Sequence, residues 1–195
     1  MNGHLFGTVK RVVGPVVEAG NVADVEMLEL VLVGDERLVG EVVRIRQDTA
    51  WLQVYEDTTG LRPGAPVYGQ GEPLSVELGP GLVGSIYDGI QRPLDVLKAQ
   101  AGDFVSKGVH APALNRSRKW NFTPVAQAPC PATGGMIIGA VHETDLIEHK
   151  ILLHPRVEGE LIYIAPPGEY EVEDVVAIVK NAEREIKVAL YQKWP

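Results

Sequence analysis

Apolar and polar residues alternate in short segments over residues 1–70 of the chain. Gly, Pro, Asn or Asp separates one segment from the next, a pattern typical of β-strands joined by turns. Closing such a meander into a small barrel leaves no exposed sheet edge and fills a narrow interior with Val, Leu and Ile. We therefore expect an N-terminal six-stranded-type β-barrel. The predicted strands are 7–19, with a bend or bulge at Gly14-Pro15, followed by 27–33, 38–45, 51–55 and 65–68.

The stretch 77–97 interrupts this strand pattern. Four residues prevent a strand at 74–78 from continuing: Gly79, Pro80, Gly81 and Gly84. Four apolar residues then recur at helical spacing, which predicts a helical face: Ile86, Ile90, Leu94 and Leu97. Pro93 would break a long helix but suits the first turn of a second short one, where its missing N–H has no intrahelical partner.

Residues 79–84 read GPGLVG and match the dinucleotide-binding pattern G-x-G-x-x-G between a predicted strand and a predicted helix. Three features oppose that function. Pro80 removes an N–H from the turn that would donate to a pyrophosphate, Gly89 and Pro93 shorten the helix, and no clear βαβ repeat follows. We interpret the motif as a structural turn.

Residues 125–188 have the rhythm of a second β-rich unit. Apolar runs such as MIIGAV, KILL and ELIYI end at glycines or prolines. The chain has 195 residues, and its 21 glycines, 14 prolines and few aromatic residues favour many short strands over long helices. The fold class is mainly β.

Charge and cysteine content limit the possible partners. The net charge of −8 and pI near 5.1 disfavour binding to nucleic acid or to an anionic membrane. One cysteine, Cys130, allows no intrachain disulfide and fits a reducing compartment. Because it lies between two prolines without a basic neighbour to activate it, a packed thiol is favoured over a reactive one. The sequence contains neither a secretory signal pattern nor an apolar run of the roughly 20 residues that span a membrane.

Three groups of residues resemble functional clusters. Glu56 and Asp57 form an adjacent carboxylate pair, but neighbours on a strand point to opposite faces, so a solvated strand end is favoured over an acid–base pair. A basic–aromatic cluster could bind single-stranded nucleic acid, but three charges are few, and a turn or a subunit contact is favoured. Its members are Arg116, Arg118, Lys119, Trp120 and Phe122.

Histidines and carboxylates also gather in the later part of the chain. The histidine spacings match no compact ligand template, so we interpret these residues as surface positions and assign no metal site. The set comprises His142, His149 and His154 with Glu143, Asp145 and Glu148.

Long ordered segments resemble a known family, the catalytic A subunit of V-type and archaeal A-type rotary ATPases, in its N-terminal part. The most specific are ELGPGLVGSIYDGIQRPL and KWNFTP, whereas 125–188 matches more loosely through GG, KI and PPGEY landmarks. Other segments match in the same order: GTVKRVVGPVVEA, LVGEVVRI, AWLQVYEDTTGLRPGAPV and VSKGVHAPALN.

The resemblance implies a domain organisation. Residues 1–70 would be the crown β-barrel, which contacts the barrels of neighbouring B subunits in a hexameric head. Residues 71–115 would be a linker and the first, partly helical section of the nucleotide-binding domain. Residues 116–189 would be a barrel-sandwich-like insertion (bulge) domain that contacts the peripheral stalk, and 190–195 would return to the nucleotide-binding domain. The head would be cytoplasmic and peripheral to the membrane, without direct membrane insertion.

The resemblance also implies an activity, ATP hydrolysis or synthesis coupled to proton or sodium transport, with MgATP or ADP bound by the full-length protein. No G-x-x-x-x-G-K-[ST] occurs in the chain, so it has no phosphate-binding loop of that type. We therefore assign no catalytic, cofactor-binding or metal-binding residue, and expect this fragment to bind no cofactor and to be inactive alone.

Two alternatives remain open. Residues 134–179 resemble the barrel-sandwich fold of biotinyl and lipoyl carriers, with Lys150 as a possible attachment site, but neither Met-Lys-Met nor Asp-Lys is present. The chain could also be an autonomous protein-binding module that reuses the ATPase crown.

Overall fold

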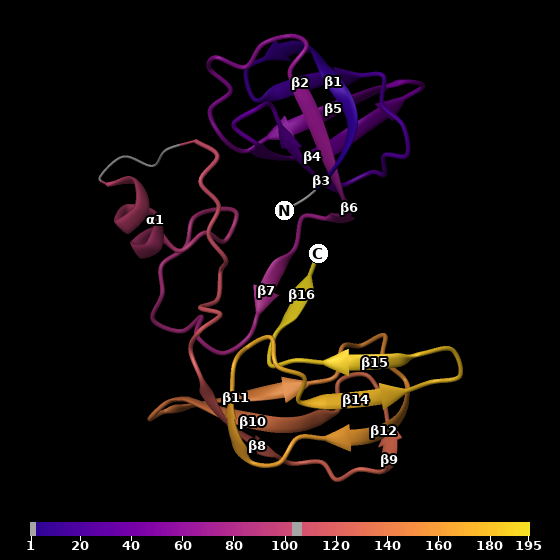
Figure 1. Cartoon of the computed structure of the whole chain (residues 1–195), viewed down its shortest axis with the longest axis vertical. Helices are drawn as coiled ribbons and strands as arrows, with labels where there is room; N and C mark the ends of the chain where they lie inside the picture. The colour runs from indigo at the N-terminus through magenta and orange to yellow at the C-terminus, as the bar shows by residue number, and fades with distance from the viewer. Residues whose placement is uncertain (1–2, 103–106) are drawn as a thin grey trace. The chain divides into compact units, whose positions relative to one another are not determined.

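The computed structural model describes residues 3–102 and 107–195 (Figure 1). The described residues form two compact units, which are treated separately below. The barrel unit contains the chain up to Ser75 together with Asp95–Ala111, and the sandwich unit contains Val76–Leu94 and Pro112–Trp194. No helix in the described residues is both long and apolar enough to cross a membrane.

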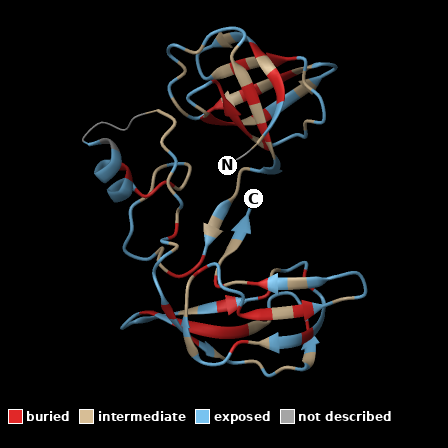
Figure 2. Ribbon diagram, in the orientation of Figure 1, coloured by how far each residue is buried: buried red, intermediate tan, exposed pale blue. Residues whose placement is uncertain are grey.

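The first unit is built on a closed antiparallel barrel with the strand order β1-β2-β5-β4-β3-β6. The predicted six-stranded barrel is therefore confirmed. Valines and leucines fill its interior, where burial of each such side chain contributes about 1.5–3 kcal/mol, and Figure 2 shows these buried positions alternating along the strands. The strands are β1 (His4–Val13), β2 (Val16–Gly20), β3 (Glu29–Val33), β4 (Leu38–Arg46), β5 (Thr49–Val54) and β6 (Pro66–Pro73).

The bend or bulge predicted at Gly14-Pro15 is wrong, because these two residues form the turn of a hairpin. Val13 of β1 pairs with Val16 of β2, so the segment reverses direction there. Gly14 has a φ of 57°, and Pro15 has its ring-restricted negative φ. Positive φ at only the first central residue is the property of a type II′ turn, whose twist suits a hairpin.

The second unit is a pair of four-stranded antiparallel sheets with the orders β11-β10-β8-β13 and β15-β14-β12-β9. Its apolar core includes Phe122, Ile138 and Leu161, so the predicted second β-rich unit is confirmed. The first sheet contains β8 (Trp120–Pro124), β10 (Ile137–Thr144), β11 (Ile147–Leu152) and β13 (Gly168–Tyr170). The second contains β9 (Cys130–Ala132), β12 (Gly159–Ile164), β14 (Ala177–Lys180) and β15 (Glu185–Val188).

A two-stranded ribbon begins and ends the sandwich unit. It pairs β7 (Val76–Leu78) with β16 (Gln192–Trp194), so that Leu78 faces Gln192 in the antiparallel register. The strand predicted at 74–78 is thus present but shorter. The ribbon brings the two ends of the unit together. The glycine-rich turn that follows β7 therefore begins beside the residue at which the chain enters β16.

The helical face predicted from Ile86 to Leu97 is only partly correct. The described helix is α1 (Leu94–Ala101), so a short helix is present where it was expected, but Pro93 lies directly before it and not in its first turn. Asp88 explains why no helix forms earlier: its Oδ1 accepts the N–H groups of Ile90 and Arg92, at 3.1 and 2.8 Å. This local side-chain bonding competes with helical hydrogen bonds. Ile86 is accordingly 70% exposed, whereas Leu97 is buried.

Candidate functional site

The glycine-rich loop at residues 79–84, hereafter the glycine loop, binds a carboxylate of its own chain. Oε1 of Glu143 accepts the N–H of Gly81 at 2.7 Å and the N–H of Val83 at 3.1 Å. The Glu143 side chain is only 3% exposed. Two backbone N–H groups that could have bound a phosphate oxygen are therefore occupied by an internal anion, which supports the interpretation of this motif as a structural turn.

Glycine is required at the centre of this loop for two reasons. Gly81 has a φ of 107°, a conformation that residues with a Cβ rarely adopt. A Cβ there would also lie 3.1 Å from Cζ2 of the Trp120 indole, which is buried in the sandwich core. The loop is thus pressed against an aromatic side chain on one side and held by the Glu143 carboxylate through its N–H groups.

Glu143 faces inward because it lies two residues after the buried Val141, on the same side of β10. In the β10–β11 hairpin, His142 pairs with Glu148 and Thr144 pairs with Ile147, which leaves Glu143 as an extra residue between two consecutive pairs. Despite this bulge, buried and exposed residues still alternate from Val141 to Thr144. His142 and Thr144 are exposed, whereas Glu143 is buried.

One histidine accompanies this carboxylate. Nδ1 of His149 lies 3.5 Å from Oε2 of Glu143. Burial lowers the pKa of His149, and the negative charge of Glu143 only partly opposes that shift. Of the histidine and carboxylate set noted in the sequence, the structure pairs His149 with Glu143, while His142 is exposed and His154 packs against Trp194 at 5.2 Å between ring centroids. No group of three or more potential ligands gathers within the described residues.

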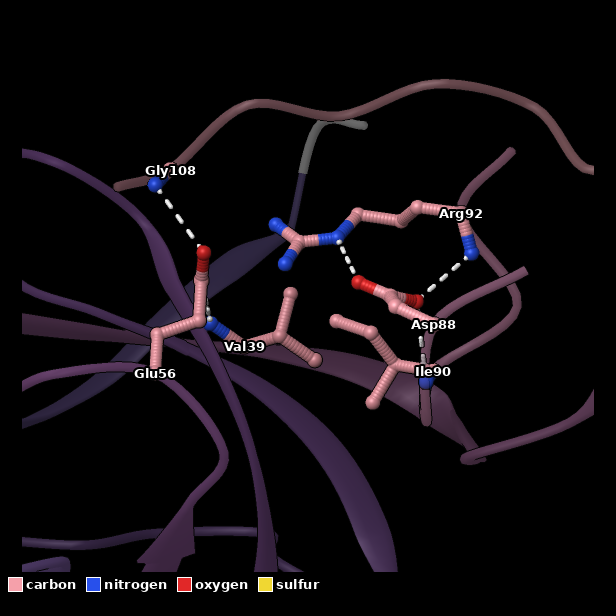
Figure 3. Close-up of polar contacts among 6 residues, drawn as sticks. All are labelled: Val39, Glu56, Asp88, Ile90, Arg92 and Gly108. Atoms are coloured by element: carbon pink, nitrogen blue, oxygen red, sulfur yellow. Dashed lines mark hydrogen bonds and ion pairs between the residues drawn. The ribbon is translucent and has the colours of Figure 1, made fainter. Parts of the chain in front are cut away.

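Glu56 and Asp57 have separate partners rather than each other. Glu56 accepts the N–H of Val39 at 2.9 Å and that of Gly108 at 3.1 Å, as Figure 3 shows. Asp57 accepts the hydroxyl and N–H of Thr59, at 2.7 and 2.9 Å. The Thr59 hydroxyl, with help from Lys107, holds the pKa of Asp57 well below its usual range. Neither carboxylate is arranged as an acid–base pair.

The Glu56 contact holds the segment after α1 on the barrel. Gly108 has a φ of 66°, and a Cβ at that position would collide with the carbonyl oxygen of Glu36. Lys107 lies beside it, with Nζ 2.9 Å from Oδ2 of Asp57. The backbone therefore approaches the barrel closely only because residue 108 is glycine.

Asp88 and Arg92 form a compact ion pair within the turn that precedes α1 (Figure 3). Nε of Arg92 lies 2.7 Å from Oδ2 of Asp88. Burial alone would raise the pKa of Asp88, but the hydrogen bonds from the N–H and guanidinium of Arg92 hold it below its usual value. This pair is a structural element of the turn.

The basic–aromatic cluster is divided: its two aromatic rings are buried in the sandwich core, Arg116 is half-buried, and Arg118 and Lys119 are exposed. Arg116 forms ion pairs with Glu77 and Glu173. The guanidinium of Arg118 lies 3.8 Å from the ring centroid of Trp120. Trp120 and Phe122 are core residues, 4% and 1% exposed, so neither presents a ring on which a nucleic-acid base could stack.

Lys150 is not at a hairpin tip. It lies within β11 opposite Ala140, whereas the turn of this hairpin is at Asp145 and Leu146. It lines an apolar groove of about 470 Å³ together with Leu82 and Trp194. The position differs from the tight turn that carrier chemistry requires. Cys130 lies half-buried in β9, opposite Leu161.

One carboxylate that the sequence does not reveal has the same role as Glu56 and Glu143. Glu29 is 3% exposed and accepts the N–H groups of Glu26 at 3.0 Å and Gly71 at 2.9 Å. Glu29, Glu56 and Glu143 each join two backbone N–H groups. No local motif marks such acceptors, because at least one donor to each of them is distant in sequence.

Two family descriptions match separate parts of this chain. The ATP synthase alpha/beta family beta-barrel domain matches residues 9–71, where the structure has its closed barrel. The ATPsynthase alpha/beta subunit barrel-sandwich domain matches residues 111–195, where it has the two facing sheets. The chain belongs to the ATP synthase alpha/beta family.

Curated members of this family are similar over nearly the whole chain. The A subunit of the A-type ATP synthase from Thermococcus sibiricus is 52% identical over 97% of the chain, and its counterpart from Hyperthermus butylicus is also 52% identical over 97%. The chain spans only about a third of their length, 33% and 32% respectively. These relatives confirm the resemblance to this component of archaeal A-type ATPases.

A solved structure of the assembled ATPase EscN from the type III secretion system of enteropathogenic E. coli is a more distant neighbour. It is 24% identical, covers 45% of this chain and 21% of its own, and has a TM-score of 0.42. A likeness of this size carries no argument about function.

Proposed function

We propose that this chain forms the N-terminal part of a catalytic A subunit in a V/A-type rotary ATPase, with a structural role in assembly. The observation that carries the proposal is the order of the two family domains, barrel followed by barrel sandwich, in one chain. We propose the division 1–70, 71–115, 116–189 and 190–195 for its crown barrel, linker, insertion and return segment. Partners are the B subunits and the peripheral stalk, in a cytoplasmic head peripheral to the membrane.

Exposed apolar side chains on the barrel support contact with a neighbouring barrel. Met27 and Leu28 are 53% and 55% exposed, and Val43 is the extra residue of a bulge in β4. The N–H of Leu28 donates to the carbonyl of Val42 at 2.8 Å, so these residues lie together on the barrel wall. Because a closed barrel offers no sheet edge, such a contact must use side chains and not strand addition.

The hairpin β10–β11 offers a second apolar contact, which supports a stalk-facing role for the insertion. Leu146 lies at its turn and is 95% exposed, with Ile147 beside it. A fully exposed leucine at a hairpin tip gains little stability for the folded chain. Burial against a partner would remove that apolar surface from water.

ATP turnover in this proposal belongs to the full-length protein, which would bind MgATP or ADP and couple hydrolysis or synthesis to proton or sodium transport. The proposal assigns no catalytic, cofactor-binding or metal-binding residue to this chain. It is supported by the absence of G-x-x-x-x-G-K-[ST] from the sequence and by the occupation of the glycine loop by Glu143. The purified chain should show no ATP turnover, and MgATP should not raise its melting temperature.

Co-purification with B subunits tests the assembly role. The chain should elute with B subunits of an A-type ATP synthase in size-exclusion chromatography with light scattering, and Val43→Asp should weaken that complex. Val125→Asp is the matched control, since Val125 is 63% exposed but lies in the sandwich unit. Absence of a complex at concentrations well above micromolar, or equal weakening by both variants, would contradict the proposed barrel contact.

A further inference from the structure

In the part of the sandwich unit that the structure describes, β11 has the longest free edge of the two facing sheets. It is the end strand of its sheet and pairs with β10 alone among the described strands (Figure 1). It has six residues, whereas the other end strands, β9, β13 and β15, have three, three and four. An edge strand presents N–H and C=O groups that can pair with a further strand, so β11 offers the longest such template.

The backbone groups of Lys150 and Leu152 face away from β10. Leu153, directly after β11, faces toward it, because its N–H donates to the carbonyl of Met136 at 2.9 Å. Backbone groups of successive residues in a strand point in opposite directions, so those of Leu152 and Lys150 point outward. The side-chain amide of Gln192 agrees with this direction, because its Nε2 donates to the carbonyl of Leu152.

The apolar groove of about 470 Å³ runs along this edge. All five residues of the segment 149–153 line it, whereas one face of a strand would contribute only alternate residues. Leu78, Gln192 and Trp194 of the β7–β16 ribbon line it as well. The volume lies within the range of about 300–1,000 Å³ that is typical of ligand-binding clefts. We name this cavity the β11 groove.

The lining of the β11 groove favours a peptide with apolar and acidic side chains. Ile151 and Leu153 belong to the apolar core, so an added strand would meet apolar neighbours such as Leu82 on their side. On the other side it would meet the exposed side chain of Lys150. Among the described residues that line the groove none is a carboxylate, and Glu148 lies outside the lining. Charge complementarity therefore favours a carboxylate opposite Lys150.

Gln192 presents an unmatched hydrogen-bond acceptor in this lining. Its Oε1 is buried and has no hydrogen-bond partner among the described residues, while its Nε2 already covers the carbonyl of Leu152. Buried polar atoms in folded proteins nearly always have a partner. The N–H of a bound peptide would supply the missing donor.

We propose that the β11 groove is a docking site for an extended segment of a different protein, which pairs antiparallel with β11 as an added strand. Every pairing in this sheet is antiparallel, so the segment would continue its pattern. Main-chain hydrogen bonds to Lys150 supply affinity, and alternating apolar and acidic side chains supply specificity. The site lies wholly in the sandwich unit, so it depends neither on ATP turnover nor on the proposed barrel contact.

Titration of the intact 195-residue chain with a synthetic peptide tests this docking site. The probe is a short acetylated and amidated peptide in which valine alternates with aspartate. Backbone amide shifts, followed by NMR, should change at Lys150 and Leu152. Hydrogen exchange of the Lys150 amide should slow by about tenfold or more at saturation, because this N–H would gain a partner.

Two modified peptides test whether the contact is strand pairing. In an antiparallel pair, the residue opposite Lys150 exchanges backbone hydrogen bonds with it and has its side chain on the same side. N-methylation of the aspartates removes those donors and should weaken binding by about tenfold or more. N-methylation of the valines instead should have a smaller effect. These peptides are tested on the unmodified chain, so the result does not depend on the folding of a variant.

Reversal of one charge tests the predicted complementarity. Lys150→Glu should weaken binding of the valine–aspartate peptide by about tenfold and should improve binding of the same peptide with lysine in place of aspartate. Lys187→Glu is the matched control, since Lys187 is also an exposed lysine on an end strand, β15. It should leave the affinity for both peptides unchanged.

Five outcomes would overturn the proposal. Three concern the peptide: no shift change at millimolar concentration, equal binding after N-methylation of the aspartates, or equal weakening by Lys150→Glu and Lys187→Glu. The other two would assign the edge to another occupant. A dimer in light scattering that the peptide dissociates would indicate a second copy of this chain. A protected Lys150 amide in a monomer before any peptide is added would indicate a segment of the same chain.

Discussion

The barrel and the sandwich both hold connecting segments against their sheets with carboxylates, but their sheets differ in closure. The barrel closes on itself, so every strand has two neighbours and the connecting segments are tied to its outside by carboxylates such as Glu56. The sandwich has open sheets, with β11 and β13 at the edges of one and β15 and β9 at the edges of the other. There a carboxylate from within the bulged strand β10 holds the glycine loop. In the barrel such ties come both from a connecting segment, at Glu56, and from the start of β3, at Glu29, whereas in the sandwich the tie at Glu143 comes from inside a strand.

The largest expected effects on stability come from truncating one buried side chain in each of the two cores. Phe122→Ala should lower the free energy of unfolding of the sandwich unit by about 3–5 kcal/mol, and Leu52→Ala that of the barrel unit by about 2–5 kcal/mol, because both side chains are fully buried in distinct clusters. Residue-resolved hydrogen exchange measures each unit. If Phe122→Ala lowers protection equally in the barrel, the two units are one cooperative structure and the comparison fails.

Removal of the Glu143 carboxylate should have the next largest effect. Glu143→Ala leaves the N–H groups of Gly81 and Val83 without their acceptor and should cost about 2–4 kcal/mol in denaturant-induced unfolding. Glu143→Gln keeps an oxygen acceptor and should cost roughly 1 kcal/mol. Equal losses in the two variants would show that burial of the side chain, and not its hydrogen bonds, determines the effect.

The barrel's tie should be weaker because Glu56 is only half-buried. Glu56→Ala should lower the free energy of unfolding by about 1–3 kcal/mol, since the N–H groups of Val39 and Gly108 lose their acceptor. Asp57→Asn is the adjacent control. Asp57 is exposed, so water replaces its contacts and thermal unfolding should show no measurable change. A larger loss for Asp57→Asn would invert the proposed ranking.

The smallest expected effect is the pH dependence from His149. Since the folded chain has a lowered pKa at this residue, the unfolded chain binds the proton more readily, and stability is complete above about pH 6.5 and declines as the pH falls through that value. One histidine contributes at most about 1.4 kcal/mol per pH unit. His149→Gln should flatten the curve of unfolding free energy against pH, measured by urea denaturation, while His142→Gln should leave it unchanged.

The hairpin at Gly14-Pro15 and the turn at Asp88 show where local patterns reach their limit. Alternation in 7–19 correctly indicates β-structure, but a bulge and a reversal have similar local signals until Val13 is paired with Val16. The apolar spacing of Ile86 and Leu94 suggests a helix, yet the Asp88 side chain binds the backbone N–H groups that such a helix would use. The spacing of apolar residues gives no information about this competition between a side chain and the helical hydrogen bonds.

Local sequence was enough to establish that this chain is mainly β, that a barrel precedes a second β-rich unit, and to which family it belongs. These properties follow from the alternation of neighbouring side chains and from long ordered segments. Most donors to Glu29, Glu56 and Glu143 are distant in sequence, so these contacts emerge only in the folded chain. A carboxylate that will tie two segments together is locally indistinguishable from one in water, because its role is fixed by where the rest of the chain folds.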